Sequence, residues 1–265
     1  MQEAQVPSSR ELLTLLRLSA EAVLANGGET YRVEETVERI CKALGVQETE
    51  VLAIPTGVVI TYFTPQTDCQ TVLVRIKSRR VDLSKINAAN TISRQIASGE
   101  LNAAQAIGAF TALSKQKEWP WYISVLATGF SCGLFTLLFG GNVFDGMVSA
   151  LCGFAVQLSS LAISRRIPHQ WFHCLIGGVI TAVITLSVIT LTGMGNRDYI
   201  ISGAIMPLLP GLAMTNAIRD TIHGDLVSGA ARGLEALIVA GAIAAGVGLV
   251  LKIWLIQGGG APLVG

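Results

Sequence analysis

Five apolar segments in the second half of the chain constrain the fold most strongly. They run over about 119–140, 144–164, 171–192, 199–218 and 230–256. Each is close to the roughly 20 residues that a helix needs to cross the hydrocarbon core of a bilayer. Because lipid offers no hydrogen bonds to the backbone, segments of this length are expected to be helices. The sequence therefore predicts a membrane domain of five transmembrane helices over residues 119–265.

Charge and glycine are distributed unevenly between the two parts of the chain. Residues 1–118 hold 13 acidic and 13 basic side chains, whereas 119–265 hold five and six, although 51% of the whole chain is hydrophobic. Glycines number six in the first part and 22 in the second, as expected where helices pack closely in lipid. We interpret the motifs GFSCG at 129–133 and GAARG at 229–233 as packing within the bundle, with a subunit interface as the alternative.

The first 118 residues are predicted to form a small cytoplasmic α+β domain. Apolar residues recur at helical spacing from Leu12 to Leu24 and from Val33 to Leu44, and the first of these runs ends at Asn26-Gly27-Gly28. β-Branched runs between Val51 and Ile76 predict two or three strands. Two further helices are expected at about 84–97 and 101–114.

Several classes of function are disfavoured by composition. All three histidines lie outside residues 1–118, which leaves that domain without a Ser-His, Cys-His or histidine-metal arrangement, so no enzyme is predicted. The five cysteines include no CxxC pair and are interpreted as reduced, with no metal and no cofactor. The net charge of +1 gives no reason to expect nucleic acid.

Basic residues near the predicted spans indicate the orientation. Lys115 and Lys117 precede the first span, Arg165 and Arg166 follow the second, and Arg219 follows the fourth. The positive-inside bias places these ends in the cytoplasm. No signal peptide is recognisable at the start, so the N-terminus is predicted inside and the C-terminus outside.

The fourth span is predicted to be broken in its middle. Pro207, Pro210 and Gly211 together delete backbone hydrogen bonds and favour an interruption. Freed backbone groups are tolerated in a membrane only where protein or a water-filled cavity satisfies them. A half-helix starting after Gly211 would direct its positive end toward a substrate carboxylate, with Thr215 and Asn216 one turn further on.

Polar residues after this break form the candidate substrate-binding site or transport path. The set is Pro210, Gly211, Thr215, Asn216, Arg219, Asp220, His223, Asp225, Arg232 and Glu235. Two alternatives stay open: that 219–225 is an ordinary cytoplasmic loop, and that Arg232 and Glu235 form an interfacial ion pair. Asp145 and Lys252 are expected to be outer-face or snorkelling residues.

Three stretches give the chain a resemblance to the threonine/serine exporter family. They are NGGETYRVEETVERIC, PTGVVITYF and PGLAMTNAIRDTIHGDLVSGAARGLEAL. The residues that match the family pattern are Asn26, Gly27, Glu29, Thr30, Pro210, Gly211, Asn216, Arg219, Asp220, Gly224, Asp225, Gly229, Arg232 and Glu235.

The resemblance implies a proton-driven secondary transporter of the bacterial inner membrane that exports small amino acids. Single-chain members carry about ten spans, so this chain resembles the larger subunit of the split form, in which a small membrane protein of about 150 residues supplies the rest. Some split members are associated with succinate, and every candidate substrate bears a carboxylate. Asp220, Asp225, Glu235 and His223 are equally reasonable proton carriers.

A membrane-anchored sensor or scaffold with a ligand-binding cytoplasmic domain is the alternative function. A sensor needs no broken helix followed by arginine, asparagine and aspartate, which favours the transporter. Whether several subunit pairs assemble into a higher oligomer stays open.

Overall fold

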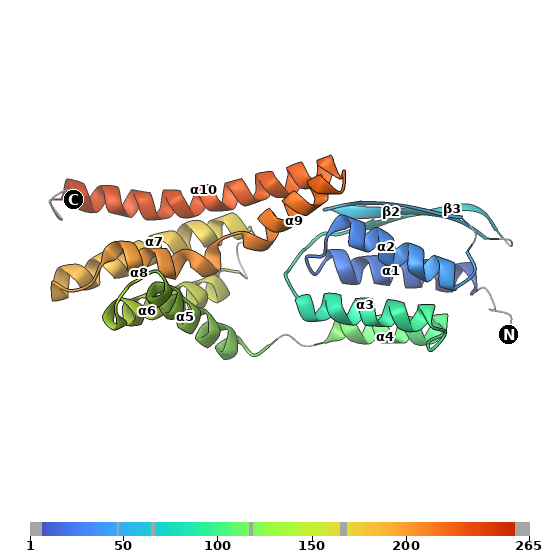
Figure 1. Cartoon of the computed structure of the whole chain (residues 1–265), viewed down its shortest axis with the longest axis horizontal. Helices are drawn as coiled ribbons and strands as arrows, with labels where there is room; N and C mark the ends of the chain where they lie inside the picture. Colours follow the sequence, from blue (N-terminus) through green and yellow to red (C-terminus); the bar gives the residue numbers. More distant parts are fainter. Residues whose placement is uncertain (1–6, 47, 65–66, 117–118, 165–168, 258–265) are drawn as a thin grey trace. The chain divides into compact units, whose positions relative to one another are not determined.

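The structure, a computed structural model, describes residues 7–46, 48–64, 67–116, 119–164 and 169–257. Within these ranges the chain is mostly helical and contains one small three-stranded sheet (Figure 1). By its internal contacts it divides into two compact units, one of residues 1–117 with 212–233 and one of 118–211 with 234–265. Lys117, Arg165 and Arg166, which carry part of the predicted orientation, lie outside the described residues.

The described residues up to 116 form the predicted helices and strands in the predicted order. The elements are α1 (Ser9–Leu24), α2 (Thr30–Ala43), β1 (Glu48–Ile54), β2 (Gly57–Thr64), β3 (Thr67–Arg75), α3 (Leu83–Ala97) and α4 (Ala103–Lys115). The sheet has the order β1-β2-β3, and both strand pairs are antiparallel. The sequence therefore predicted the four helices to within a few residues. It predicted two or three strands, and the sheet has three.

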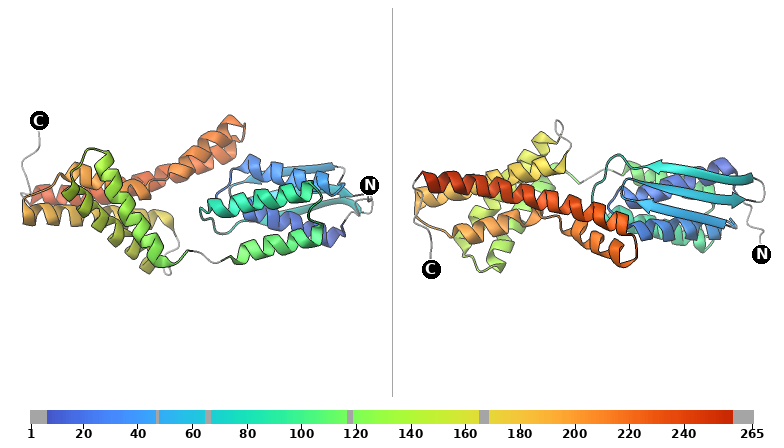
Figure 2. Two further views of the ribbon diagram at one scale, coloured as in Figure 1. Left: turned by 60° about the horizontal axis from the view of Figure 1, so that its bottom comes forward. Right: turned by 90° about the horizontal axis from the view of Figure 1, so that it is seen from above.

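The core of this domain lies between layers. The sheet packs on α1 and α2, and these two helices pack in turn on α3 and α4 (Figures 1 and 2). The apolar stripes predicted from the sequence supply the core, in which Leu12, Leu16, Val33 and Val37 are fully buried. Phe110 of α4 is buried in the same core. Burial of such side chains is worth roughly 1.5–3 kcal/mol each.

The second half of the chain is helical and contains several candidate membrane spans. Its helices are α5 (Trp121–Leu138), α6 (Val143–Ile163), α7 (Gln170–Thr192), α8 (Arg197–Ile205), the 3-10 helix η1 (Met206–Leu208), α9 (Gly211–Ile222) and α10 (Leu226–Ile256). Among the described residues, α5, α6, α7 and α10 are each long and apolar enough to cross a membrane. The stretch from α8 to α9 brings the number to five if it counts as one span.

The predicted break in the fourth span is confirmed. α8 and η1 end at Leu208, α9 begins at Gly211, and the two helical parts are bent by 58°. Pro207 and Pro210 have no backbone N–H to continue a helical ladder, and the ring of Pro210 disfavours helical dihedrals at Leu209. Leu209 is accordingly extended, with φ −63° and ψ 138°.

Glycines allow the spanning helices to approach closely. A Cβ on Gly133 of α5 would lie 2.9 Å from the carbonyl oxygen of Gly146 on α6, and one on Gly129 would collide with Phe154. The GFSCG motif therefore packs helices within the bundle, as predicted. On α7, a Cβ on Gly178 would lie 2.8 Å from the carbonyl oxygen of Ile243 on α10.

The structure does not show Asp145 as a snorkelling residue, because its side chain is buried. Its side chain is 1% exposed and takes part in a capping box with Asn142 at the start of α6. Asp145 also contacts a residue 51 positions further along the chain: its Oδ1 accepts a hydrogen bond from the backbone N–H of Asn196 at 2.8 Å. Asp145 thus ties the start of α6 to the start of α8, because it satisfies backbone donors at both helix ends.

Candidate functional site

Three candidate residues of α9 lie on one face of that helix, and a fourth follows its end. Asn216, Arg219 and Asp220 are in neighbouring turns of α9, and the N–H of His223, one residue after the helix, bonds to the carbonyl oxygen of Arg219. Asn216 is 5% exposed and Asp220 is fully buried. The alternative that 219–225 is an ordinary loop is therefore wrong for Arg219 and Asp220, which are helical.

A tight reversal then brings the start of α10 back against α9. Gly224 has a φ of +94°, which favours glycine, and Asp225 follows before α10 begins. A Cβ on Gly229 would lie 2.9 Å from the carbonyl oxygen of Ala217, so this glycine of the GAARG motif packs α10 on α9. We call residues 212–233 the α9–α10 hairpin; they belong to the same compact unit as the N-terminal domain.

The partner of this hairpin is the connection between α1 and α2. Residues 27–31, which we call the 27–31 segment, turn sharply because Gly27 has a φ of +89°. Gly28 has no room for a side chain: a Cβ there would lie 2.5 Å from Cγ1 of Val23 and 2.9 Å from its carbonyl oxygen. The two glycines therefore allow the backbone to expose its carbonyl oxygens to the hairpin.

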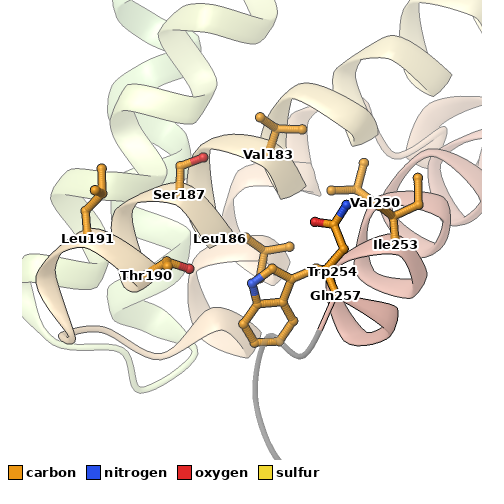
Figure 3. Close-up of a pocket in the computed structure, with 9 residues that line it drawn as sticks. All are labelled: Val183, Leu186, Ser187, Thr190, Leu191, Val250, Ile253, Trp254 and Gln257. Carbon is orange, nitrogen blue, oxygen red and sulfur yellow. The ribbon is translucent and has the colours of Figure 1, made fainter.

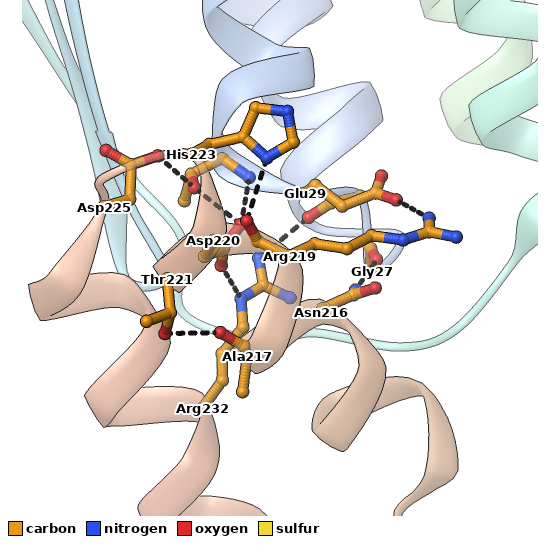
Figure 4. Close-up of polar contacts among 12 residues, drawn as sticks. Gly27, Glu29, Asn216, Ala217, Arg219, Asp220, Thr221, His223, Asp225 and Arg232 are labelled. Carbon is orange, nitrogen blue, oxygen red and sulfur yellow. Dashed lines mark hydrogen bonds and ion pairs between the residues drawn. The ribbon is translucent and has the colours of Figure 1, made fainter.

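Three side-chain donors of the hairpin converge on three consecutive residues of the 27–31 segment (Figure 4). All three distances are those of good hydrogen bonds, and one pair is also an ion pair. The pairs are Asn216 Nδ2 to Gly27 O at 2.9 Å, Arg232 Nη2 to Gly28 O at 2.8 Å, and Arg219 Nη1 to Glu29 Oε1 at 2.6 Å.

A buried ion pair lies at the centre of these contacts. Arg232 Nε is 3.0 Å from Asp220 Oδ2, and the two side chains are 5% and 0% exposed. Thr30 completes the surroundings of Asp220, since its N–H and its hydroxyl both reach Oδ1, at 3.4 and 2.9 Å. The same hydroxyl is 2.9 Å from Asp225 Oδ2, and because it carries one hydrogen it donates to one carboxylate at a time.

The last residue of the segment meets the hairpin through its ring. Tyr31 stacks on His223 with ring centroids 4.2 Å apart and an interplanar angle of 3°. Nδ1 of His223 is 2.9 Å from the carbonyl oxygen of Arg219, within hydrogen-bond distance, so the histidine also lies against its own helix. Every residue from Gly27 to Tyr31 therefore contacts the hairpin.

Two carboxylates beside the cluster have shifted pKa values, in opposite directions. Burial alone would raise the pKa of Glu29, but hydrogen bonds from its own backbone and from Arg219, with the charges of Arg32 and Arg219, lower it. The pKa of Glu34 is raised, first by burial and then by the charges of Asp225, Glu38 and Asp220, against a backbone hydrogen bond from Ala53. Glu34 thus faces a local excess of negative charge.

Six of the ten candidate residues meet in this cluster. They are Asn216, Arg219, Asp220, His223, Asp225 and Arg232. Pro210 and Gly211 lie at the break before α9, Thr215 is exposed on α9, and Glu235 is half-buried on α10. Arg232 forms an ion pair with Asp220 on the neighbouring helix, a partner that was not predicted from the sequence.

Sequence reasoning did not include the 27–31 segment in the site. Gly27, Glu29 and Thr30 belong to the motif that carries the family resemblance, and that motif was the one available signal. Nothing in the periodicity of α2 distinguishes Glu29 or Thr30 from its solvated face, because their partners lie about 190 residues further along the chain.

The described spanning helices also carry a groove, which contains none of the candidate residues. It lies between α7 and α10, has a volume of about 780 Å³, and is mostly apolar (Figure 3). Its lining is Val183, Leu186, Ser187, Thr190, Leu191, Val250, Ile253, Trp254 and Gln257. Among the described residues, no group of three or more His, Cys, Asp or Glu side chains has the arrangement of a metal site.

Comparison with known proteins relates the chain to exporters. The sequence profile of the family described as "Putative threonine/serine exporter" matches residues 14–254. A "Probable threonine/serine exporter" of Mycobacterium tuberculosis is 22% identical over 92% of this chain and 46% of its own length. A "Probable succinate transporter subunit YjjP" of Klebsiella aerogenes is 24% identical over 97% of this chain and 99% of its own length.

The chain thus spans about half the length of the mycobacterial relative and nearly all of the YjjP relative. A "Threonine/serine exporter" of Corynebacterium glutamicum is 24% identical over 65% of this chain and 36% of its own length. No solved structure matches the chain significantly.

The two arginines of the cluster are expected to differ sharply in their effect on stability. Arg232→Ala leaves the Asp220 carboxylate buried without its cation, which costs about 3–5 kcal/mol. Arg219→Ala removes a pair whose arginine is 50% exposed, and is expected to cost at most about 1 kcal/mol. Hydrogen exchange at the Thr30 amide of the purified full chain measures the stability loss caused by each substitution. Equal losses for the two substitutions would contradict the buried-pair assignment.

Glu34→Gln is expected to stabilise the docked segment at neutral pH. Because the pKa of Glu34 is raised in the fold, the protonated form contributes stability that is present at acidic pH and is lost as pH rises from the ordinary carboxyl range through the raised value. Glutamine keeps an oxygen acceptor for the N–H of Ala53, at 2.8 Å, and carries no charge. In the Glu34→Gln variant, the protection of residues 27–31 from hydrogen exchange, corrected for intrinsic rates, is therefore expected to fall less with rising pH than in the parental chain. The exposed Glu35→Gln on the same helix is the control; a steeper pH dependence in the Glu34 variant would refute the prediction.

Proposed function

Because the chain belongs to the threonine/serine exporter family, we propose that it is one subunit of a secondary transporter that exports small carboxylate-bearing metabolites. Support comes from the family match over residues 14–254, from the names of the relatives, and from the apolar helices of a multi-pass membrane protein. The candidate substrates are threonine, serine and a dicarboxylate such as succinate.

The observation that carries the proposal is the convergence of three N–H donors directly after a broken span. Asn216, Arg219 and Arg232 each place a nitrogen 2.6–2.9 Å from an oxygen atom, and two of them are guanidinium groups. Guanidinium forks and amide N–H groups are the usual protein donors to a carboxylate. We assign these three residues to the carboxylate of the substrate, with Pro210, Gly211, Thr215 and Glu235 along the same path.

Proton coupling belongs to the same proposal. Ionisable groups near a membrane commonly serve as ion pathways and proton relays, and Asp220, Asp225, Glu235 and His223 are the candidates on or beside the hairpin. Asp220 is fully buried and forms an ion pair with Arg232. Asp225 shares the Thr30 hydroxyl with Asp220 and is half-buried, so it is the more accessible of the two aspartates to solvent.

A second subunit completes the proposed transporter. The mycobacterial relative is about twice as long as the matched region, whereas the relative of equal length is named a transporter subunit. We propose a small integral membrane partner of about 150 residues that supplies further spans, in the bacterial inner membrane. The N-terminal domain is cytoplasmic in this arrangement and the C-terminus lies outside.

The chain alone is therefore expected not to transport. Proteoliposomes that contain only this chain should show no efflux of labelled threonine or succinate above empty vesicles, whereas vesicles with the partner should show uncoupler-sensitive efflux of one of them. Binding sites built at the interface of two halves require both halves. Robust, uncoupler-sensitive efflux from the lone chain would contradict the two-subunit proposal.

Asn216→Ala is expected to lower export at sub-saturating substrate by roughly 10–100-fold, the worth of a hydrogen bond to a charged group. Membrane insertion and assembly should be unchanged, because the amide makes a single neutral hydrogen bond to Gly27. Arg232→Ala is expected to abolish export as well, but it also breaks the buried ion pair. Asn87→Ala, on an exposed face of α3, is the control. Parental export by the Asn216 variant would show that the site is misassigned.

A further inference from the structure

The donors of the proposed carboxylate site are occupied by oxygens of the chain itself. The amide of Asn216 meets the carbonyl oxygen of Gly27, and the guanidinium of Arg219 meets the carboxylate of Glu29 (Figure 4). Arg232 meets the carbonyl oxygen of Gly28. Acceptors from three consecutive residues, one of them a carboxylate, thus present the oxygen chemistry that a carboxylate-bearing metabolite would present.

We propose that the 27–31 segment is a tethered competitor of the substrate, which occupies the carboxylate site until substrate displaces it. The inference rests on the proposed function, since it concerns the same three donors. It gives the N-terminal domain a role in transport: the domain carries an intramolecular ligand, and its docking on the α9–α10 hairpin closes the site.

The hairpin is built to keep its donors in place when the segment leaves. Asp220 and Arg232 both belong to the hairpin, and their ion pair orients the guanidinium through Nε while Nη2 faces the segment. The arginine therefore does not depend on the segment for its position. Undocking removes Thr30 from Asp220 but leaves the charge of Asp220 compensated.

Several of the contacts that hold the segment are weak or solvent-exposed. The Glu29–Arg219 pair has an arginine that is 50% exposed, and such pairs contribute about 0–1 kcal/mol. The bond from Asn216 to Gly27 joins neutral groups and is worth about 1 kcal/mol. His223, which stacks on Tyr31, is exposed to solvent. A charged substrate that engages both arginines competes with contacts of comparable strength.

Competition lowers the apparent affinity for substrate by the fraction of molecules in which the site is free. Weakening the segment should therefore tighten apparent binding, whereas a purely structural role predicts the reverse. Glu29→Gln tests this, because it keeps the size of the side chain and removes the charge that Arg219 binds. In proteoliposomes of the chain with its partner, the KM for cytoplasmic-side substrate should fall by about threefold to fivefold, the equivalent of a surface ion pair.

Glu35→Gln is the matched control. Glu35 lies on the exposed face of α2, six residues after Glu29, and its substitution should leave KM unchanged. A KM that is unchanged or raised in Glu29→Gln, in a complex whose parent exports, overturns the tethered competitor and leaves the proposed function standing. A parental complex that exports neither threonine nor succinate overturns the proposed function, and the competitor with it.

Hydrogen exchange in the purified complex gives a second measurement that does not depend on turnover. The N–H of Thr30 bonds to Asp220 only when the segment is docked, whereas the N–H of Gly28 bonds to Val23 inside its own domain at 3.0 Å. Saturating threonine or succinate, added separately, should speed exchange at Thr30 and leave Gly28 unchanged. Slower or unchanged exchange at Thr30 with the substrate that the complex exports would refute displacement.

Discussion

The buried pair of Asp220 and Arg232 is the interaction on which the arrangement of the hairpin depends. Two unlike charges taken out of water require one another, because either alone would carry an uncompensated desolvation cost of several kcal/mol. Asp220 comes from α9 and Arg232 from α10, so the pair fixes the fold-back at Gly224 and the close approach at Gly229. The bonds from Arg232 to Gly28 and from Thr30 to Asp220 involve the same two side chains.

Glycine makes the complementary surface on the N-terminal domain. The positive φ of Gly27 turns the chain, and the absent side chain of Gly28 lets the segment lie against Val23. The carbonyl oxygens of both residues then accept hydrogen bonds from the hairpin, and Thr30 begins α2 with its backbone and hydroxyl already directed at Asp220. Five consecutive residues thus contact a second surface because two of them lack side chains.

Local rules predicted the elements of the fold but not their polar contacts. Apolar stripes located α1, α2, α3 and α4, and the proline-glycine cluster located the break before α9, since both signals act over a few residues. The partners of Asp145 and Arg232 were not predicted because they lie on, or at the start of, other helices: Asn196 for one, and Asp220 for the other. Charge spacing along a single helix suggested Glu235 as a partner of Arg232, and the fold-back at Gly224 brings the carboxylate of Asp220 to the same arginine.

For the proposed carboxylate site, the same chemistry explains how the protein that contains the site can also close it. A donor set that binds substrate oxygens through amide and guanidinium N–H groups discriminates poorly between those oxygens and backbone carbonyls, which are strong acceptors. Left free, such a set would be hydrated or would bind any small anion. Selectivity against that background follows when the competitor is tethered and only moderately strong, since a ligand must then engage both arginines at once to displace it. A metabolite with a carboxylate and further polar groups meets that demand, whereas a monatomic anion does not.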